Sequence, residues 1–155
     1  MAETKLNNDL LVTGTITAET GISGDLVGNV SGGHVNPKIP VIAGEDLEAG
    51  DLVYPFGYSN GYIVVKKAAA TFAWFVVPDD IDNADQGYVV GMYELGEQNT
   101  NSADVGDPVY LNAGGWTRNV PASGIIQQVG VVTAKSATEG KVLLMPFYSK
   151  GVAVA

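Results

Sequence analysis

The stretch "DLVYPFGYSNGYIVVKK" (51–67) shows the pattern that recurs through most of this chain. Two runs rich in Val, Ile, Tyr and Phe, at 51–56 and 62–67, flank the dipeptide Asn60-Gly61. β-branched and aromatic residues favour strands, and Asn-Gly between two such runs is a strong local signal for a type I′ hairpin turn. The stretch therefore predicts two antiparallel strands joined by a tight turn.

Similar runs, bounded by turn residues, follow at short intervals along the chain. Helix signals are weak, because apolar residues rarely recur at three-and-four spacing and Gly or Pro interrupts nearly every window. The further predicted strands are "IPVIA" (39–43), "TFAWFVV" (71–77), "YVVGMYEL" (88–95), "PVYL" (108–111), "GIIQQVGVVTA" (124–134) and "KVLLMPF" (141–147). Short strands at even spacing predict an all-β fold, a compact β-barrel or sandwich.

One stretch recurs within the chain. "EAGDLVY" (48–54) returns as "DVGDPVY" (104–110), and a glycine-containing turn and an aromatic residue, Tyr62 or Trp116, follow each copy. Two interpretations stay open. The chain contains a duplicated β-hairpin unit, or the two stretches converged because Gly-Asp commonly precedes a strand.

The composition changes at "GGHVNPKIP" (32–40), where two glycines and two prolines interrupt the strand pattern. Such a stretch is typical of a joint between structural units. We therefore expect two parts: an N-terminal glycine-rich β assembly segment (1–34) and a β-barrel domain (35–155).

Composition excludes several classes of function. The 155 residues carry a formal net charge of -9 and no cysteine, so neither nucleic-acid binding nor disulfide or thiolate chemistry is expected. The apolar runs are too short to span a bilayer, so no membrane partner is expected. The opening "MAETKLNNDL" lacks the pattern of a secretory signal, which predicts synthesis in the cytoplasm of the producing cell.

The motif that most resembles an enzyme's is "GYSNG" (57–61), which matches G-x-S-x-G. A nucleophile elbow needs a strand, a sharp turn at the serine and then a helix, whereas Ser59 precedes a predicted hairpin turn and a strand. The triad also needs a histidine, and the sequence has only His34, in the expected joint. The hairpin interpretation is favoured, and we expect no enzyme activity.

Metal and ligand signals are also weak. "PDDIDNAD" clusters Asp79, Asp80, Asp82 and Asp85. It departs from the calcium-loop pattern after Asp82, which favours a solvated acidic loop over weak calcium binding. His34 cannot build a zinc site without further Cys or His ligands, so no metal or cofactor is expected. Trp74 and Trp116 could form a sugar-stacking platform, but aromatic residues in strands are usually core residues, and the core interpretation is favoured for both.

The segment "GISGDLVGNVSGG" (21–33) alternates apolar residues and glycines on one face of an extended strand. The same pattern begins upstream at Val12 and Ile16. The strand-favouring residues Thr, Val and Ile argue against a disordered tail. A single strand of this kind can neither bury its apolar side chains nor satisfy its backbone edges. We therefore expect it to assemble with other chains, around an axis or at the edge of a partner's sheet. The candidate contact residues are Val12, Ile16, Ile22, Gly24, Leu26, Gly28 and Val30.

Two resemblances cover most of the chain. "LLVTGTITAETGISGDLVGNVSGG" (10–33) resembles fibre-like trimeric segments of tailed-bacteriophage structural proteins. The remainder is similar to small phage head decoration, or cement, proteins. The stretches that carry this similarity are "VIAGEDLEAGDLVY" (41–54), "VGDPVYLNAGGWT" (105–117) and "VGVVTAKSATEGKVLLMPF" (129–147).

The resemblance implies a non-enzymatic structural protein of the virion. Such a protein would form a homotrimer, bind the major capsid protein at threefold or quasi-threefold sites of the outer capsid surface, and stabilise the head. The family has no catalytic residues to transfer. The alternative is a tail-fibre or adhesin module whose barrel binds a host-surface glycan through exposed aromatic residues such as Tyr58, Tyr62 or Trp116. A hydrolase using Ser59 is a third hypothesis, which we do not favour.

Overall fold

The computed structural model describes residues 36–148 and 151–154, and these residues confirm the predicted all-β fold class. The strands are β1 (Ile39–Ala43), β2 (Leu52–Ser59), β3 (Tyr62–Lys67), β4 (Phe75–Val76), β5 (Gln86–Val89), β6 (Tyr93–Gln98), β7 (Pro108–Asn112), β8 (Gly115–Thr117), β9 (Gly124–Ala134), β10 (Gly140–Leu144) and β11 (Gly151–Val154). A 3-10 turn, η1 (Pro146–Tyr148), follows β10. The expected segment 1–34 lies outside the described residues, so its boundary with 35–155 stays a prediction.

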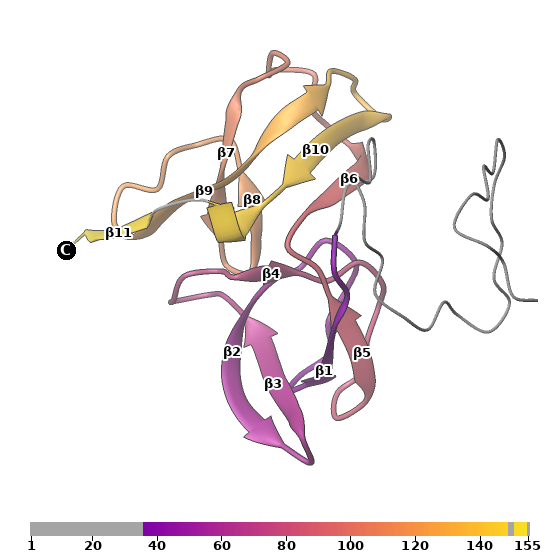
Figure 1. The fold of residues 1–155 in the computed structure, drawn as a ribbon. Coiled ribbons are helices and arrows are strands. Elements are labelled where there is room, and N and C mark those ends of the chain that lie inside the picture. Colours follow the sequence, from indigo (N-terminus) through magenta and orange to yellow (C-terminus); the bar gives the residue numbers. More distant parts are fainter. Residues whose placement is uncertain (1–35, 149–150, 155) are drawn as a thin grey trace, which may run out of the picture. The chain divides into compact units, whose positions relative to one another are not determined.

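The first sheet, called here the barrel sheet, has the strand order β4-β2-β3-β1-β5 (Figure 1). β1 pairs with β3 in parallel and with β5 in antiparallel fashion. An isolated bridge between Val76 and Val90 links β4 to the end of β5, so the sheet nearly closes on itself. Its interior holds a buried cluster: Val41, Ala43, Leu47, Val53, Val65, Val77, Ile81 and Val89.

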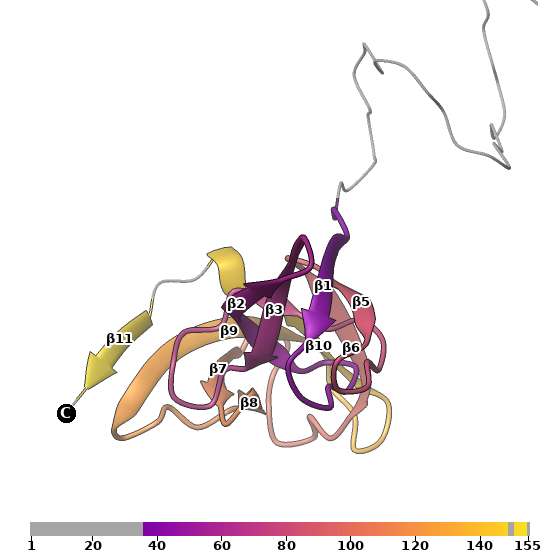
Figure 2. The same cartoon turned by 90° about the horizontal axis from the view of Figure 1, so that it is seen from below.

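The second sheet, called here the half-barrel sheet, has the order β6-β10-β9-β7-β8. β9 is long and curved, and β11 pairs with its first residues, Gly124 to Gln127 (Figure 2). Between the two sheets lies a second buried cluster, to which β9 and β10 contribute Val129, Val132, Val142 and Leu144. The barrel sheet contributes Leu52, Val76 and Val90 to this cluster.

The barrel wall therefore serves both cores. Neighbouring residues of a strand point to opposite faces. Three pairs of adjacent apolar residues place one side chain in each cluster. Leu52, Val76 and Val90 lie in the cluster between the sheets, and their neighbours Val53, Val77 and Val89 lie in the cluster inside the barrel. Each fully buried Val or Leu side chain stabilises the fold by about 1.5–3 kcal/mol. Since both faces are apolar here, this part of the wall shows no alternation of polar and apolar residues.

The repeated sequence stretches form equivalent turns. The Asp51 carboxylate accepts a hydrogen bond from the Glu48 N–H at 2.7 Å, and Asp107 accepts one from the Asp104 N–H at 2.8 Å. The glycine before each of these aspartates has a positive φ, 94° in the first turn and 95° in the second. This is a left-handed conformation that glycine adopts at little cost.

The equivalence extends to whole units. Asn60-Gly61 and Ala113-Gly114 both have two successive positive φ values, as type I′ hairpins require. The first unit is β1 to β5 and the second is β6 to β10. In the first unit β2 pairs with β3 and β4, and in the second the corresponding β7 pairs with β8 and β9. In the same way, β1 pairs with β5 in the first unit, and β6 pairs with β10 in the second. These shared pairings favour the interpretation as a duplicated unit. The parallel link between β1 and β3 has no counterpart between β6 and β8 among the described residues, so the second unit stays half open.

Two predicted strands are wrong in extent. "TFAWFVV" (71–77) is a strand only at Phe75–Val76, because the Ala73 N–H donates to the Gln127 side chain instead of to a neighbouring strand. "YVVGMYEL" (88–95) splits into β5 and β6, because the chain leaves the barrel sheet at Gly91 and Met92 and enters the half-barrel sheet.

The end of the chain also differs from expectation. The strand predicted at 141–147 ends at Leu144, and Pro146, which lacks an N–H, opens the 3-10 turn. The short strand Gly151–Val154 is absent from the predicted set.

Because β9 packs closely against β10, we predict that Gly130→Ala lowers the stability of the fold. A Cβ atom at residue 130 would overlap the carbonyl oxygen of Leu143, a backbone atom that cannot rotate away. We expect a loss of about 1–3 kcal/mol in the free energy of unfolding, measured by urea denaturation. The matched control is Gly96→Ala in β6, where a Cβ would have open space. Equal effects of the two substitutions would contradict this packing.

Candidate functional site

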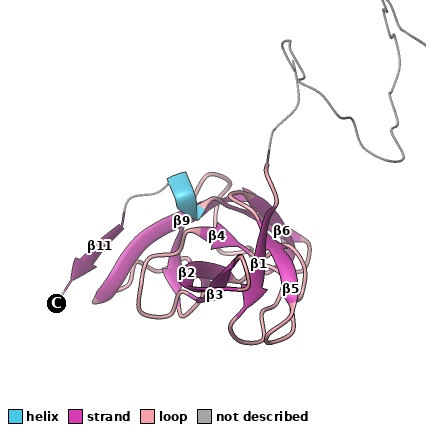
Figure 3. Cartoon of the chain, turned by 60° about the horizontal axis from the view of Figure 1, so that its bottom comes forward, coloured by secondary structure: helices cyan, strands magenta, loops and turns pink. Residues whose placement is uncertain are grey.

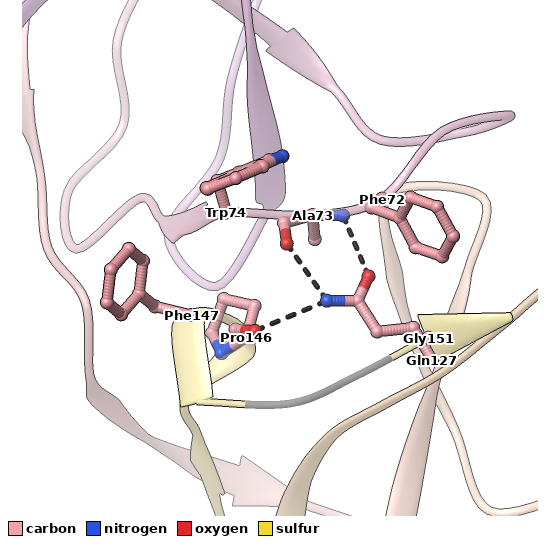
Figure 4. A pocket seen from close by; sticks show the side chains of 7 residues that line it. All are labelled: Phe72, Ala73, Trp74, Gln127, Pro146, Phe147 and Gly151. Atoms are coloured by element: carbon pink, nitrogen blue, oxygen red, sulfur yellow. Dashed lines mark hydrogen bonds between the residues drawn. The ribbon is translucent and has the colours of Figure 1, made fainter.

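A small pocket lies where the loop before β4 meets β9, η1 and β11 (Figure 4). Its volume is about 160 Å³. The residues that line it are Phe72, Ala73, Trp74, Gln127, Pro146, Phe147 and Gly151. The pocket thus brings together segments that lie far apart in the sequence.

The floor of the pocket is held by the Gln127 side chain, which is 2% exposed. Its Oε1 accepts a hydrogen bond from the Ala73 N–H at 2.8 Å, and its Nε2 donates to the Ala73 carbonyl at 2.9 Å. Nε2 also donates to the Pro146 carbonyl at 3.2 Å. The amide therefore takes the place of a strand partner for the loop and ties that loop to η1.

Aromatic rings form the rim. Trp74 is 49% exposed and Phe147 is 57% exposed, and their ring centroids lie 6.3 Å apart with the planes tilted by 60°. Figure 4 shows Phe72 on the opposite side of the Gln127 amide from these two rings. A side chain at Gly151 would strike the Phe72 ring, so glycine permits the close approach of β11.

The chemistry of this site is binding rather than reaction. None of the seven lining residues titrates near neutral pH, so they supply no general acid, general base or charged nucleophile. An apolar cavity of about 150 Å³ is large enough to hold one benzene ring. The pocket can therefore receive one ring or one aliphatic side chain, held by dispersion and ring contacts.

The residues predicted to form the assembly stripe lie outside the described residues. They are Val12, Ile16, Ile22, Gly24, Leu26, Gly28 and Val30. His34 lies outside them as well. Their assignment to trimer or capsid contacts stays a prediction.

The G-x-S-x-G motif forms a hairpin. Ser59 is the last residue of β2, and the type I′ turn at Asn60-Gly61 leads directly into β3. A nucleophile elbow would continue into a helix. The structure therefore agrees with the hairpin interpretation of this motif.

The acidic loop supports local backbone structure. Asp80 Oδ1 accepts a hydrogen bond from the Ala49 N–H at 2.9 Å. Within residues 36–148 and 151–154, no three His, Cys, Asp or Glu side chains gather closely enough to hold a metal ion.

The two tryptophans have different environments. Trp116 is half-buried against the cluster between the sheets, in agreement with the core interpretation. For Trp74 that interpretation is wrong, because Gln127 holds Ala73 inward and the next residue exposes its ring beside Phe147. Of the tyrosines named for glycan binding, Tyr58 is 75% exposed and Tyr62 is half-buried.

In the part of the chain that the structure describes, no helix has the length and apolar character needed to cross a membrane. No family model matches the chain, and no curated protein matches it. Among solved structures, it is similar to the N base of head fiber gp8.5 of bacteriophage phi29, with a TM-score of 0.49 and 19% sequence identity. The similarity covers 72% of this chain and 93% of that chain.

The engaged amide predicts that Gln127→Leu destabilises the protein. Leucine fills a similar volume but leaves the N–H and carbonyl of Ala73 without the partners that they have in the structure. We expect a loss of about 2–4 kcal/mol in urea denaturation, since buried unpaired polar groups cost about 1–3 kcal/mol each. The neighbouring, exposed Gln128 provides the control, because Gln128→Leu should change stability by no more than about 0.5 kcal/mol. If both variants unfold like the wild type, the bonds of Gln127 do not hold the loop.

Proposed function

We propose that this chain is a non-enzymatic structural protein of a tailed-bacteriophage virion. It binds the major capsid protein on the outer surface of the head as a homotrimer, at threefold or quasi-threefold sites, and it stabilises the head. In this role it catalyses no reaction and uses no cofactor.

The observation that carries the proposal is the place of the resembling stretches in the fold. Residues 41–54 cover the end of β1, the first Gly-Asp turn and the start of β2. Residues 105–117 form the second Gly-Asp turn and the β7–β8 hairpin, and residues 129–147 include most of β9 and all of β10. The similarity to head decoration proteins therefore lies in the elements that build both sheets.

The buried polar side chains support a structural role. Among the described residues, Thr100 and Gln127 are the buried polar ones. The Thr100 hydroxyl donates to the Ala134 carbonyl at 2.7 Å and accepts from the Ser136 N–H at 3.0 Å. Since these contacts all join backbone segments, both side chains serve the fold rather than a reaction.

A second candidate function is a tail-fibre or adhesin module that binds a host-surface glycan. The exposed Trp74 ring beside Phe147 favours it, because a flat aromatic surface can stack against a sugar ring. Attachment of purified protein to host cells, abolished by Trp74→Ala, would support this candidate. Absence of capsid binding in the same preparation would exclude the decoration role.

The assembly stripe provides the test of the decoration role. We expect Leu26→Asp with Val30→Asp to abolish trimers or capsid binding, because carboxylates cannot be buried between apolar strand faces without a large cost. Light scattering measures the mass, and co-sedimentation with capsids of the encoding phage that lack this protein measures binding. The control places the same charges on the other face of the segment, with Ser23→Asp and Asn29→Asp. Unchanged trimers and unchanged capsid binding in the first variant would remove the stripe from the interface.

A further inference from the structure

The half-barrel sheet leaves one side of the barrel wall uncovered. Figure 3 shows β2, β3, β1 and β5 following one another around the barrel. On β1, β3 and β5, the inward positions Val41, Val65 and Val89 are fully buried. The alternate positions of these strands face outward, and Pro40 and Tyr88 among them are exposed.

These outward positions form one continuous face across the strands. Pro40 lies opposite Tyr88, and Ile42 lies beside Val64. In the middle of β2 the register shifts between Pro55 and Gly57, which leaves Phe56 at a bulge. Bulges commonly redirect a side chain, and here the Phe56 ring lies under the Lys66 ammonium group.

Two lysine–aromatic pairs dominate this face. Lys66 Nζ lies 4.1 Å from the Phe56 ring centroid, and Lys38 Nζ lies 5.8 Å from the Tyr88 ring centroid. Phe56 is 55% exposed and Tyr88 is 53% exposed. We define the aromatic–lysine face as Lys38, Pro40, Phe56, Val64, Lys66 and Tyr88.

The charge of this face is opposite to that of the chain. The barrel-sheet strands contain Lys66 and Lys67 and no Asp or Glu, although the whole chain has a net charge of -9. Lys67 pairs with Asp51 at 2.9 Å. Among the described residues, no carboxylate forms an ion pair with Lys38 or Lys66. The face is therefore a local positive region on an acidic protein.

The duplicated unit offers an internal comparison. On the corresponding wall, formed by β6 and β10, Lys141 pairs with Glu94 at 3.0 Å, and the Thr133 hydroxyl donates to Glu94 at 3.2 Å. The hydrogen bond from Lys141, followed by the one from Thr133, lowers the pKa of the Glu94 carboxyl below its ordinary value. On that wall the lysine therefore has a carboxylate partner, unlike Lys38 and Lys66 among the described residues.

We propose that the aromatic–lysine face docks onto a protein surface that presents carboxylates among aliphatic side chains. This inference rests on the proposed function, under which that surface is the outer face of the capsid protein. Exposed aromatic anchors beside cations are typical of protein interfaces, and complementary charge sets orientation and association rate. Lys38 and Pro40 follow within a few residues of the segment expected to assemble, so the two contact regions are continuous along the chain.

Other partners fit these observations less well. A second copy meeting this face with its own aromatic–lysine face would place lysines against lysines. Nucleic acid would require many more cations than this face carries. A carboxylate-bearing protein surface suits both the exposed rings and the two lysines, which have no ion pair among the described residues.

The experiment compares two variants of this face with a charge-matched control for the first of them. Lys38→Glu with Lys66→Glu reverses the charge of the face, and Phe56→Ser with Tyr88→Ser removes its rings. The control, Lys135→Glu with Lys141→Glu, makes the same change on the half-barrel sheet, where both lysines are exposed and ion-paired. Co-sedimentation with undecorated capsids of the encoding phage measures affinity at low and high salt.

We expect each face variant to lose about tenfold or more in capsid affinity, while the control binds like the wild type. Wild-type binding should weaken as salt rises, because salt screens the lysine–carboxylate attraction. Light scattering should give the wild-type mass for every variant, and urea denaturation should show that each is folded.

The outcomes separate this inference from the function on which it rests. A wild-type protein that binds no capsids overturns the proposed function. If the wild type binds and the folded face variants bind equally well, the face is not the docking surface. Two further results would overturn the inference. A reduced mass of the face variants would make the face a contact between copies of the chain. Binding of the wild type to phosphatidylglycerol vesicles, lost in the face variants, would make it a lipid-binding face.

Discussion

The fold depends on a barrel wall with an apolar core on each side. Leu52, Val76 and Val90 pack between the two sheets, and their chain neighbours Val53, Val77 and Val89 pack inside the barrel. A shift of one residue in strand register would exchange the two sets, because successive side chains point to opposite faces. The wall therefore couples the packing of both cores, and a change in one core cannot be absorbed without moving the other.

This coupling explains how far the fold could be predicted from the sequence. The strands 39–43, 62–67 and 124–134 have the predicted bounds. Gly44 follows the first strand, Gly61 precedes the second and Gly124 opens the third. Along the barrel wall that both cores share, residues of this kind mark the strand ends less clearly. The runs 71–77 and 88–95 remain apolar across their true ends, so each looks like one strand. The pocket was also hidden, because the signal for Gln127 is one amide within a strand and its partners are backbone groups.

The two halves of the fold share their turns and differ in their strands. The positive φ values at Gly50 and Gly106 and the two type I′ hairpins require particular residues, whereas a strand accepts many apolar or polar side chains. The first unit closes through the parallel pairing of β1 with β3, and the second stays open. The Leu52 N–H donates to the Gly114 carbonyl at 2.6 Å, so a hydrogen bond as well as apolar packing joins the barrel sheet to the open unit. One outer wall thus carries the Lys141–Glu94 ion pair, and the other carries the exposed rings of Phe56 and Tyr88.

The exposed surfaces differ in the size of partner that they suit. The pocket holds about 160 Å³, the space of a single ring, and its amide is already bonded to backbone groups. Sugar recognition there would depend mainly on stacking, with little hydrogen bonding to the hydroxyl groups. The aromatic–lysine face instead extends over four neighbouring strands, which span roughly 15 Å at the usual spacing of a sheet. Attachment over several strands distributes binding over many contacts and fixes orientation, as a protein that reinforces a shell requires. The extended face therefore favours the structural role over recognition of a single sugar.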